Sequence, residues 1–345
     1  MKKCILALIV FLISVQMQAQ LKTEREPYIV KKLSAESIKN VVLETTGGNI
    51  TVEGTASDAR LEVYITPNSN KMSLSNEEIK KRLEEEYDLD ISVSDSKLSA
   101  KASTKSRNID WKKALNISYK AYVPNNVSTD LSTSGGNINL KDLSGEQDFG
   151  TSGGNLNIDN VSGKIKGRTS GGNMKVIHSK ANINLSTSGG NIHAEDVSGD
   201  SRLTTSGGNL TLKSLKGNIY ASTSGGNVNG NEIEGELIAT TSGGSIHLDG
   251  IAGSLETSTS GGNINVSITE LGKYIKINNS AGNVDVEMPG SKGLDLKLFA
   301  SKISTDVMKN FNGTVDDDVV EGKLNGGGIP VTIHAGSGKI NISFN

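Results

Sequence analysis

TSGGN, at Thr133–Asn137, returns in nearly the same form seven more times along the 345 residues of this chain. The first glycine of each copy lies 18 residues after the previous one, at Gly135, Gly153, Gly171, Gly189, Gly207, Gly225, Gly243 and Gly261. A fixed short period is typical of repeat architectures, in which each unit contacts only its neighbours. The chain is therefore best interpreted one repeat at a time.

The aliphatic residues of the repeat follow a period of two. With the first glycine numbered one, position four is Ile138, Leu156, Met174, Ile192, Leu210, Val228, Ile246 or Ile264. Positions six, nine, thirteen and fifteen are also mostly apolar, and position eleven is usually glycine. Alternation of this kind belongs to strands and not to helices.

One repeat is too small to bury its own apolar row, but stacked copies can bury a continuous one. Coils stacked at about 4.8 Å let every backbone group pair with the coils above and below. The sequence therefore predicts an all-β, single-chain β-solenoid (β-helix) with about 18 residues per coil. At that spacing, the repeats form a rod segment of roughly 35 to 40 Å.

The repeated polar residues suggest a scaffold at one corner of each coil. We expect the glycine pairs to supply positive φ values at a sharp turn, and Thr133 and its equivalents to form an inward hydroxyl ladder. We expect a matching amide ladder to satisfy backbone groups at the corner. Its members are Asn137, Asn155, Asn173, Asn191, Asn209, Asn227 and Asn263. This interpretation makes the glycine and asparagine series structural and not a ligand site.

The flanking sequence predicts four parts. Residues 1–20 have a basic start, an apolar run of about eleven residues and a plausible cleavage site, as in a signal peptide. That run is well short of the roughly 20 residues that span a bilayer. Residues 21–130 contain strands and a helix at about 76–88, capped by Asn76, that lead into the solenoid. Residues 131–285 form the regular repeat, and 286–345 form an irregular β segment that caps it.

Composition excludes several classes of function. The only cysteine, Cys4, precedes the apolar run of the signal peptide, so the mature chain has no disulfide and no thiolate metal site. Loss of Lys2 and Lys3 with the signal leaves 34 basic (36 minus two) and 38 acidic residues, a net charge of −4. This balance argues against nucleic acid as a partner and against a polybasic membrane contact.

Catalytic and metal-binding patterns are weak. His193 and His247 share position five, but they are three coils apart, roughly 14 Å, which is too far for one metal ion. We expect no metal, no cofactor and no enzymatic activity. Asp142 and Asp159 are left open as a carboxylate pair, because neighbouring coils could supply the separation of about 5 to 9.5 Å that glycoside hydrolysis uses.

The chain resembles the bacterial putative-adhesin family, exported proteins of unknown function built on β-strand repeats. The resemblance lies in ISYKAYVPNNVSTDLSTSGGNI, in the TSGGN units and in the closing GGGIPVTIHAGSGKINI. It implies a β-solenoid outside the cytoplasm and attachment to a surface, and it brings no catalytic residues.

Together these observations predict an exported, non-enzymatic surface module in the periplasm, on the outer surface or secreted. Its long lateral faces would contact a cell-surface glycan or an envelope protein, and no transmembrane anchor would remain after removal of the signal. Two alternatives are an envelope-stress or regulatory protein that docks one membrane partner, and a polysaccharide-acting β-helix enzyme that uses Asp142 and Asp159.

Overall fold

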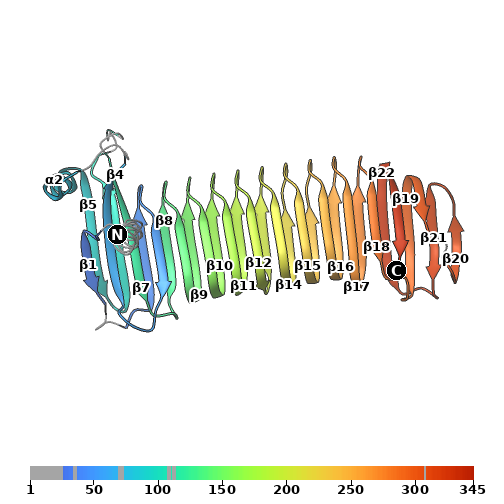
Figure 1. Ribbon diagram of the computed structural model, residues 1–345, viewed down its shortest axis with the longest axis horizontal. Helices are drawn as coiled ribbons and strands as arrows, with labels where there is room; N and C mark the ends of the chain where they lie inside the picture. The colour runs from blue at the N-terminus through green and yellow to red at the C-terminus, as the bar shows by residue number, and fades with distance from the viewer. Residues whose placement is uncertain (1–25, 34–36, 69–73, 107–109, 111–113, 307) are drawn as a thin grey trace, which may run out of the picture.

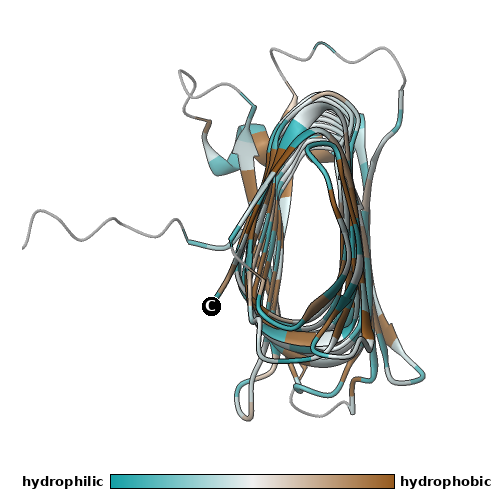
Figure 2. Ribbon diagram, turned by 90° about the vertical axis from the view of Figure 1, so that its right-hand side faces the viewer, coloured by the Kyte–Doolittle hydropathy of each residue, from teal (hydrophilic) through white to brown (hydrophobic). Residues whose placement is uncertain are grey.

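The computed structural model describes residues 26–33, 37–68, 74–106, 110, 114–306 and 308–345. The predicted signal peptide lies outside the described residues. The described chain forms a long rod made of one continuous sheet (Figure 1). Viewed along the rod, successive coils superimpose as a flattened oval (Figure 2). Within the described ranges, no helix is both long and apolar enough to cross a membrane.

The regular coils pair in parallel and in register. Leu156 lies between Ile138 of the coil before and Met174 of the coil after, each 18 residues away. The predicted β-solenoid with about 18 residues per coil is therefore confirmed. Its strands are β9 (Ile138–Thr151), β10 (Leu156–Thr169), β11 (Met174–Thr187), β12 (Ile192–Ser198), β13 (Ser201–Thr205), β14 (Leu210–Ser222), β15 (Val228–Thr240), β16 (Ile246–Thr259) and β17 (Ile264–Asn279).

The apolar rows fill the inside of the stack. Residues at positions four, six, nine, thirteen and fifteen are almost all buried. A large side chain in one coil is matched by a small residue in the next. Position fifteen is Phe149 in one coil and Gly167 in the following coil, where an added Cβ would lie 2.7 Å from the Phe149 ring. Ser179, which breaks the row at position nine, is fully buried and accepts the backbone N–H of Val161 at 3.2 Å.

The corner geometry corrects one expectation. None of the repeat's glycine pairs has a φ in the left-handed region. Left-handed residues occur instead at position eight, where φ is 56° at Asp142 and 50° at His178, and at position eleven, where φ is 119° at Gly145. Asp and Asn tolerate this conformation better than most residues, and glycine adopts it without steric cost. The turns with positive φ therefore lie at positions eight and eleven and not at the glycine pairs.

The helix, α2, spans Asn76–Glu86 and is shorter than predicted. Its N-cap is Ser75 and not Asn76, because the Ser75 hydroxyl accepts the backbone N–H of Glu78 at 3.2 Å. Tyr87 already has extended backbone angles and begins β5 (Tyr87–Ser94). The buried Tyr87 thus belongs to the sheet and not to the helix.

At the N-terminal end of the stack, the order of the rungs differs from the order of the strands in the sequence. The strands β2 (Asn40–Thr45) and β3 (Ile50–Gly54) form a rung that lies between β6 (Lys97–Thr104) with β7 (Leu115–Val123) and β8 (Ser128–Thr133) with β9. Antiparallel strands then cover the end: β5 pairs with β6, β4 (Arg60–Pro67) pairs with β7, and β1 (Ile29–Lys32) pairs with β4. The outermost strands are short or antiparallel, as expected where an open edge must be protected.

The C-terminal end of the stack is also covered by antiparallel strands. The last strand, β22 (Ile329–Phe344), pairs in parallel with β17 and β18 (Val284–Met288) on one side and with β19 (Leu294–Thr305) on the other. The antiparallel strands β21 (Val319–Leu324) and β20 (Phe311–Val315) follow β19. One sheet contains strands of the lead-in, the array and the end segment, so the division of the chain into these parts stays a prediction.

Candidate functional site

The threonines of the repeat connect the coils at the Ser-Gly-Gly corner. Thr151 donates its hydroxyl hydrogen to the carbonyl of Gly136 in the coil before, at 2.9 Å, and accepts the N–H of Gly154 in its own coil, at 3.2 Å. The same pair of bonds recurs at Thr133, Thr169, Thr187, Thr205, Thr223, Thr241 and Thr259. Buried backbone groups at the corner are thereby satisfied.

The asparagine series forms a second, parallel ladder. Each asparagine side chain accepts the backbone N–H of its counterpart in the next coil, as Asn137 Oδ1 does from Asn155 at 2.8 Å. The structure places all seven predicted asparagines in this ladder. Accepting side chains run without a gap through Ser118, Asn49, Asn137, Asn155, Asn173, Asn191, Asn209, Asn227, Ser245, Asn263 and Asn283.

The glycine that the corner needs is the second of each pair. A Cβ on Gly154 would lie 1.8 Å from the carbonyl oxygen of Gly136, whereas a Cβ on Gly153 would come no closer than 3.9 Å to another atom. The predicted series beginning at Gly135 is therefore one residue before the sterically required one. The required glycines are Gly136, Gly154, Gly172, Gly190, Gly208, Gly226, Gly244 and Gly262.

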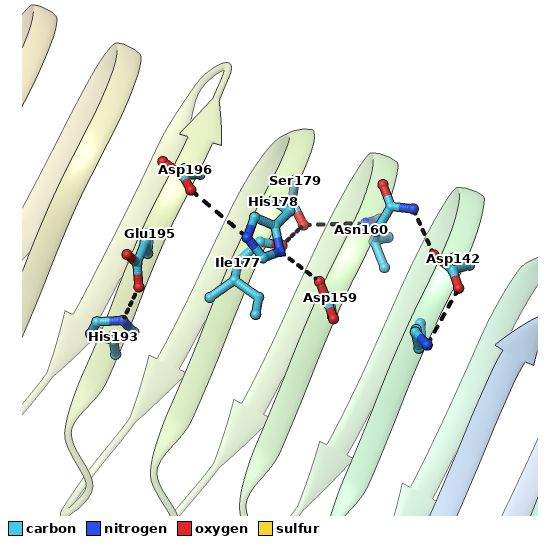
Figure 3. Close-up of polar contacts among 11 residues, drawn as sticks. Asp142, Asp159, Asn160, Ile177, His178, Ser179, His193, Glu195 and Asp196 are labelled. Carbon is cyan, nitrogen blue, oxygen red and sulfur yellow. Dashed lines mark hydrogen bonds and ion pairs between the residues drawn. The ribbon is translucent and has the colours of Figure 1, made fainter.

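The threonine and asparagine side chains of this corner are hydrogen-bonded to the backbone of neighbouring coils. Candidate functional side chains are therefore those on the lateral faces of the rod. One face carries outward residues at positions five, seven and eight of each coil. Its most connected group, shown in Figure 3, surrounds His178 at the left-handed corner of β11. His178 Nδ1 lies 2.9 Å from Asp159 Oδ1 of β10, and His178 Nε2 lies 3.8 Å from Asp196 Oδ2 of β12.

The hydrogen bond to Asp159 raises the pKa of His178 above its ordinary value, and the negative charges of Asp159, Asp196 and Glu195 act in the same direction. The His178 side chain is 58% exposed. An exposed imidazole that contacts one carboxylate of the coil before it and one of the coil after it behaves as a surface link between the three coils. Nothing in this arrangement presents an activated nucleophile.

Asp142 and Asp159 have different partners and do not face each other across the sheet. Across the sheet, Asp159 faces Lys141 and not Asp142. Asp142 instead accepts the side-chain amide of Asn160 at 2.6 Å (Figure 3). The two acids occupy positions seven and eight, which point differently because the chain turns at position eight.

His193 and His247, the two histidines at position five, are also surface residues. His193 Nε2 lies 3.2 Å from Glu195 Oε2, and Lys213 Nζ lies 2.7 Å from the other oxygen of Glu195. These bonds lower the pKa of Glu195 and raise that of Lys213. His193 and His247 are three rungs apart in the register, as expected. No cluster of three or more potential metal ligands occurs in the part of the chain that the structure describes.

Further along the same face, four carboxylates line a groove of about 520 Å³ near the C-terminal end. Each one accepts a neutral donor: Asp249 from Asn231, Asp285 from Asn341, Glu287 from Asn345 and Asp306 from the backbone of Phe344. The acids here are thus engaged in hydrogen bonds that link neighbouring rungs.

The opposite face holds a cationic groove that the sequence interpretation missed. It measures about 290 Å³ and is lined by three cations and one acid, together with neutral residues. The cations are Lys164 and Lys166 of β10 and Arg202 of β13, the acid is Asp200, and Asn182 and Asn184 of β11 lie between them. The signal was present in KIKGR, residues 164–168, where three cations alternate with buried or small residues. This alternation places all three side chains on the outside of one strand.

Comparisons with known proteins agree with the fold. Residues 22–343 match the family described as Toastrack DUF4097, and the chain belongs to that family, in accord with the resemblance found in the sequence. A search of curated proteins found no significant match.

Solved structures show similarity at low identity. A protein described as a putative cell adhesion protein from Clostridium sporogenes is 13% identical, with a TM-score of 0.21, over 92% of this chain and 98% of the other. A protein described as a putative adhesin from Bacteroides fragilis is 18% identical, with a TM-score of 0.36, over 73% and 96%. One described as a putative lipid binding protein from Parabacteroides distasonis is 14% identical, with a TM-score of 0.31, over 92% and 97%.

Proposed function

We propose that this member of the Toastrack DUF4097 family is an exported, non-enzymatic binding module that contacts a surface through its lateral faces. The observation that carries the proposal is a contrast within the repeat. Core and corner positions hold nearly the same residues in every coil, whereas outward positions differ. Position five, for example, is Asn139, Asn157, Lys175, His193, Thr211, Asn229, His247 and Asn265 in successive coils.

A rigid core with a varied exterior suits recognition along the length of the rod. The inward rows and the corner ladders fix where each outward side chain lies, at a spacing of about 4.8 Å along the stack. Many weak contacts on such a surface add up to firm attachment when the partner is itself extended or repetitive. Export is supported by the predicted signal peptide at residues 1–20.

The test is attachment of the purified chain to intact bacterial cells and to a glycan array, combined with fractionation of the producing cell. The proposal predicts that the chain is found outside the cytoplasm and binds one or more surface components. Cytoplasmic localisation, or no binding on cells and arrays, would contradict it. Capture of one specific membrane protein by crosslinking, without surface binding, would favour the regulatory alternative.

An enzyme acting on polysaccharides is the second alternative. It predicts release of soluble sugar from a glycan and loss of that release in Asp142→Ala or Asp159→Ala. The separate hydrogen-bond partners of these two acids argue for no such release.

A further inference from the structure

The groove over β10, β11 and β13 gathers cationic and amide side chains and one acid, Asp200. Lys164 faces Asn182 across the sheet, and Asn184 lies between Lys166 and Arg202 on adjacent strands. Adjacent strands are about 4.8 Å apart, so Lys166 and Arg202 are about 10 Å apart at the backbone. Two cations therefore flank a central amide on a short, rigid stretch of sheet.

Only some of the side-chain hydrogen-bond donors in this groove have partners among the residues that the structure describes. Lys166 Nζ lies 2.9 Å from Asp148 Oδ2. In the described part of the chain, the side chains of Lys164 and Asn184 have no hydrogen-bond or ion-pair partner. The Arg202 guanidinium lies 4.1 Å from the centre of the Tyr220 ring, a contact that orients the side chain without consuming its N–H groups.

The neighbouring charges set the length of the groove. Glu146 and Asp148 lie on the rung before Lys164 and Lys166. On the other side, Glu236 follows Asn218 in the column of position twelve, with the neutral Ile238 beside it. Asp200, at position twelve of the third rung, also lines the groove and accepts the side-chain amide of Asn218 at 2.9 Å. The cationic stretch therefore consists of Lys164 and Lys166 on the first rung and Arg202 on the third. This is too short for a nucleic-acid duplex and too narrow for a membrane surface.

We propose that this groove binds a short segment of an acidic polysaccharide, with Lys164, Lys166 and Arg202 contacting carboxylate or sulfate groups and Asn182 and Asn184 contacting hydroxyls. Asn side chains both donate and accept hydrogen bonds, as sugar hydroxyls do. Arginine and lysine supply charge-assisted bonds to the anionic groups. This inference rests on the proposed surface-binding function and names its ligand class.

The experiment is calorimetric titration of the full chain with three oligosaccharides of matched length: oligogalacturonate, which is carboxylated, a heparin-derived sulfated chain, and neutral dextran. Binding to one or both acidic probes and not to dextran is expected, and the stronger of the two identifies the anionic group. Failure of both acidic probes, equal binding of dextran, or tighter binding of single-stranded DNA would overturn the inference.

Two variants locate the site. Lys164→Gln with Arg202→Gln is expected to weaken binding at least about tenfold, because two charge-assisted contacts are lost. Lys213→Gln with Lys276→Gln removes the same charge from cations paired elsewhere with Glu195 and Glu256, and binding should stay within about twofold. Equal weakening in both double variants would show diffuse attraction and no groove.

Asn184→Leu keeps the charge and removes the central amide. It is expected to weaken binding of the acidic oligosaccharide several-fold, and an unchanged affinity would remove the amide from the site. Whole-cell attachment is measured with the same variants. If the lysine and arginine variant still attaches to cells as the unaltered chain does, the groove is not the contact, while the proposed surface-binding function stands.

Discussion

Asn155 donates its backbone N–H to the side-chain Oδ1 of Asn137, its counterpart 18 residues earlier, at 2.8 Å. The ladder to which this bond belongs extends past the regular repeats. At one end Ser118 accepts the N–H of Asn49, and at the other Asn283 accepts the N–H of Lys339. The interlocked end rungs thus continue the same corner bonding, which ties the irregular ends of the chain to the regular stack.

Removal of one ladder amide should weaken the stack locally. Asn155→Ala leaves the backbone N–H of Asn173 without its acceptor at 2.8 Å, so the free energy of unfolding should fall by about 1 kcal/mol. Hydrogen exchange at the Asn173 amide measures the local effect, and denaturant unfolding measures the global one. Asn182→Ala is the matched control, because its side chain has no partner in the described residues. Equal effects at both positions would contradict the ladder.

The two glycines of one corner should differ sharply in tolerance. Gly154→Ala forces a Cβ against the carbonyl oxygen of Gly136, 1.8 Å away, whereas Gly153→Ala finds open space. We expect Gly154→Ala to lower the free energy of unfolding by about 3 kcal/mol or more, and Gly153→Ala by less than about 1 kcal/mol. Thermal unfolding of the two variants gives the comparison. Similar melting temperatures would show that the coils are not stacked as described.

The packing of Phe149 against Gly167 should be a coupled pair. Gly167→Ala places a methyl group 2.7 Å from the Phe149 ring and 2.8 Å from Leu185, so a loss of about 1 to 3 kcal/mol is expected. In a Phe149→Leu background the loss should shrink, with a coupling energy of at least about 0.5 kcal/mol. A double-mutant cycle by denaturant unfolding measures it. Strict additivity would mean that these side chains do not meet.

His178 should titrate above the ordinary histidine pKa, because Asp159 stabilises its protonated form. The stabilisation is present below the unfolded value of about 6.5 and is lost as the pH rises through the raised folded pKa. Asp159→Asn should therefore lower the pKa of His178 in an NMR titration and destabilise the fold more under acidic than under alkaline conditions. Asp249→Asn is the remote control. A pKa unmoved by Asp159→Asn would exclude the hydrogen bond.

The sequence alone predicts the fold well, because the period fixes the register. An 18-residue step places Leu156 beside Ile138 and Met174, and the alternation of positions four and six tells inside from outside. The amide ladder follows from the same register. These features depend on one local pattern that is repeated many times, so each copy supports the others.

Other features depend on contacts that no local pattern contains. The need for glycine at Gly154 comes from the carbonyl of Gly136 across the corner and not from backbone dihedral angles, so the sequence pattern does not distinguish it from Gly153. Insertion of β22 between β18 and β19 is a pairing over long sequence separations. The groove that includes Arg202 joins residues from different coils with no repeated motif.

The central claim is that every coil lies directly on the one before it. Spin labels at Ser152 paired with Ser206, Ser242 or Ser260, in a chain carrying Cys4→Ser, test it by pulsed electron resonance. These pairs are three, five and six repeats apart in the sequence. Their distances should increase linearly, by about 4.8 Å per repeat. Distances that do not grow with repeat number would contradict the stacked solenoid and every inference drawn from its faces.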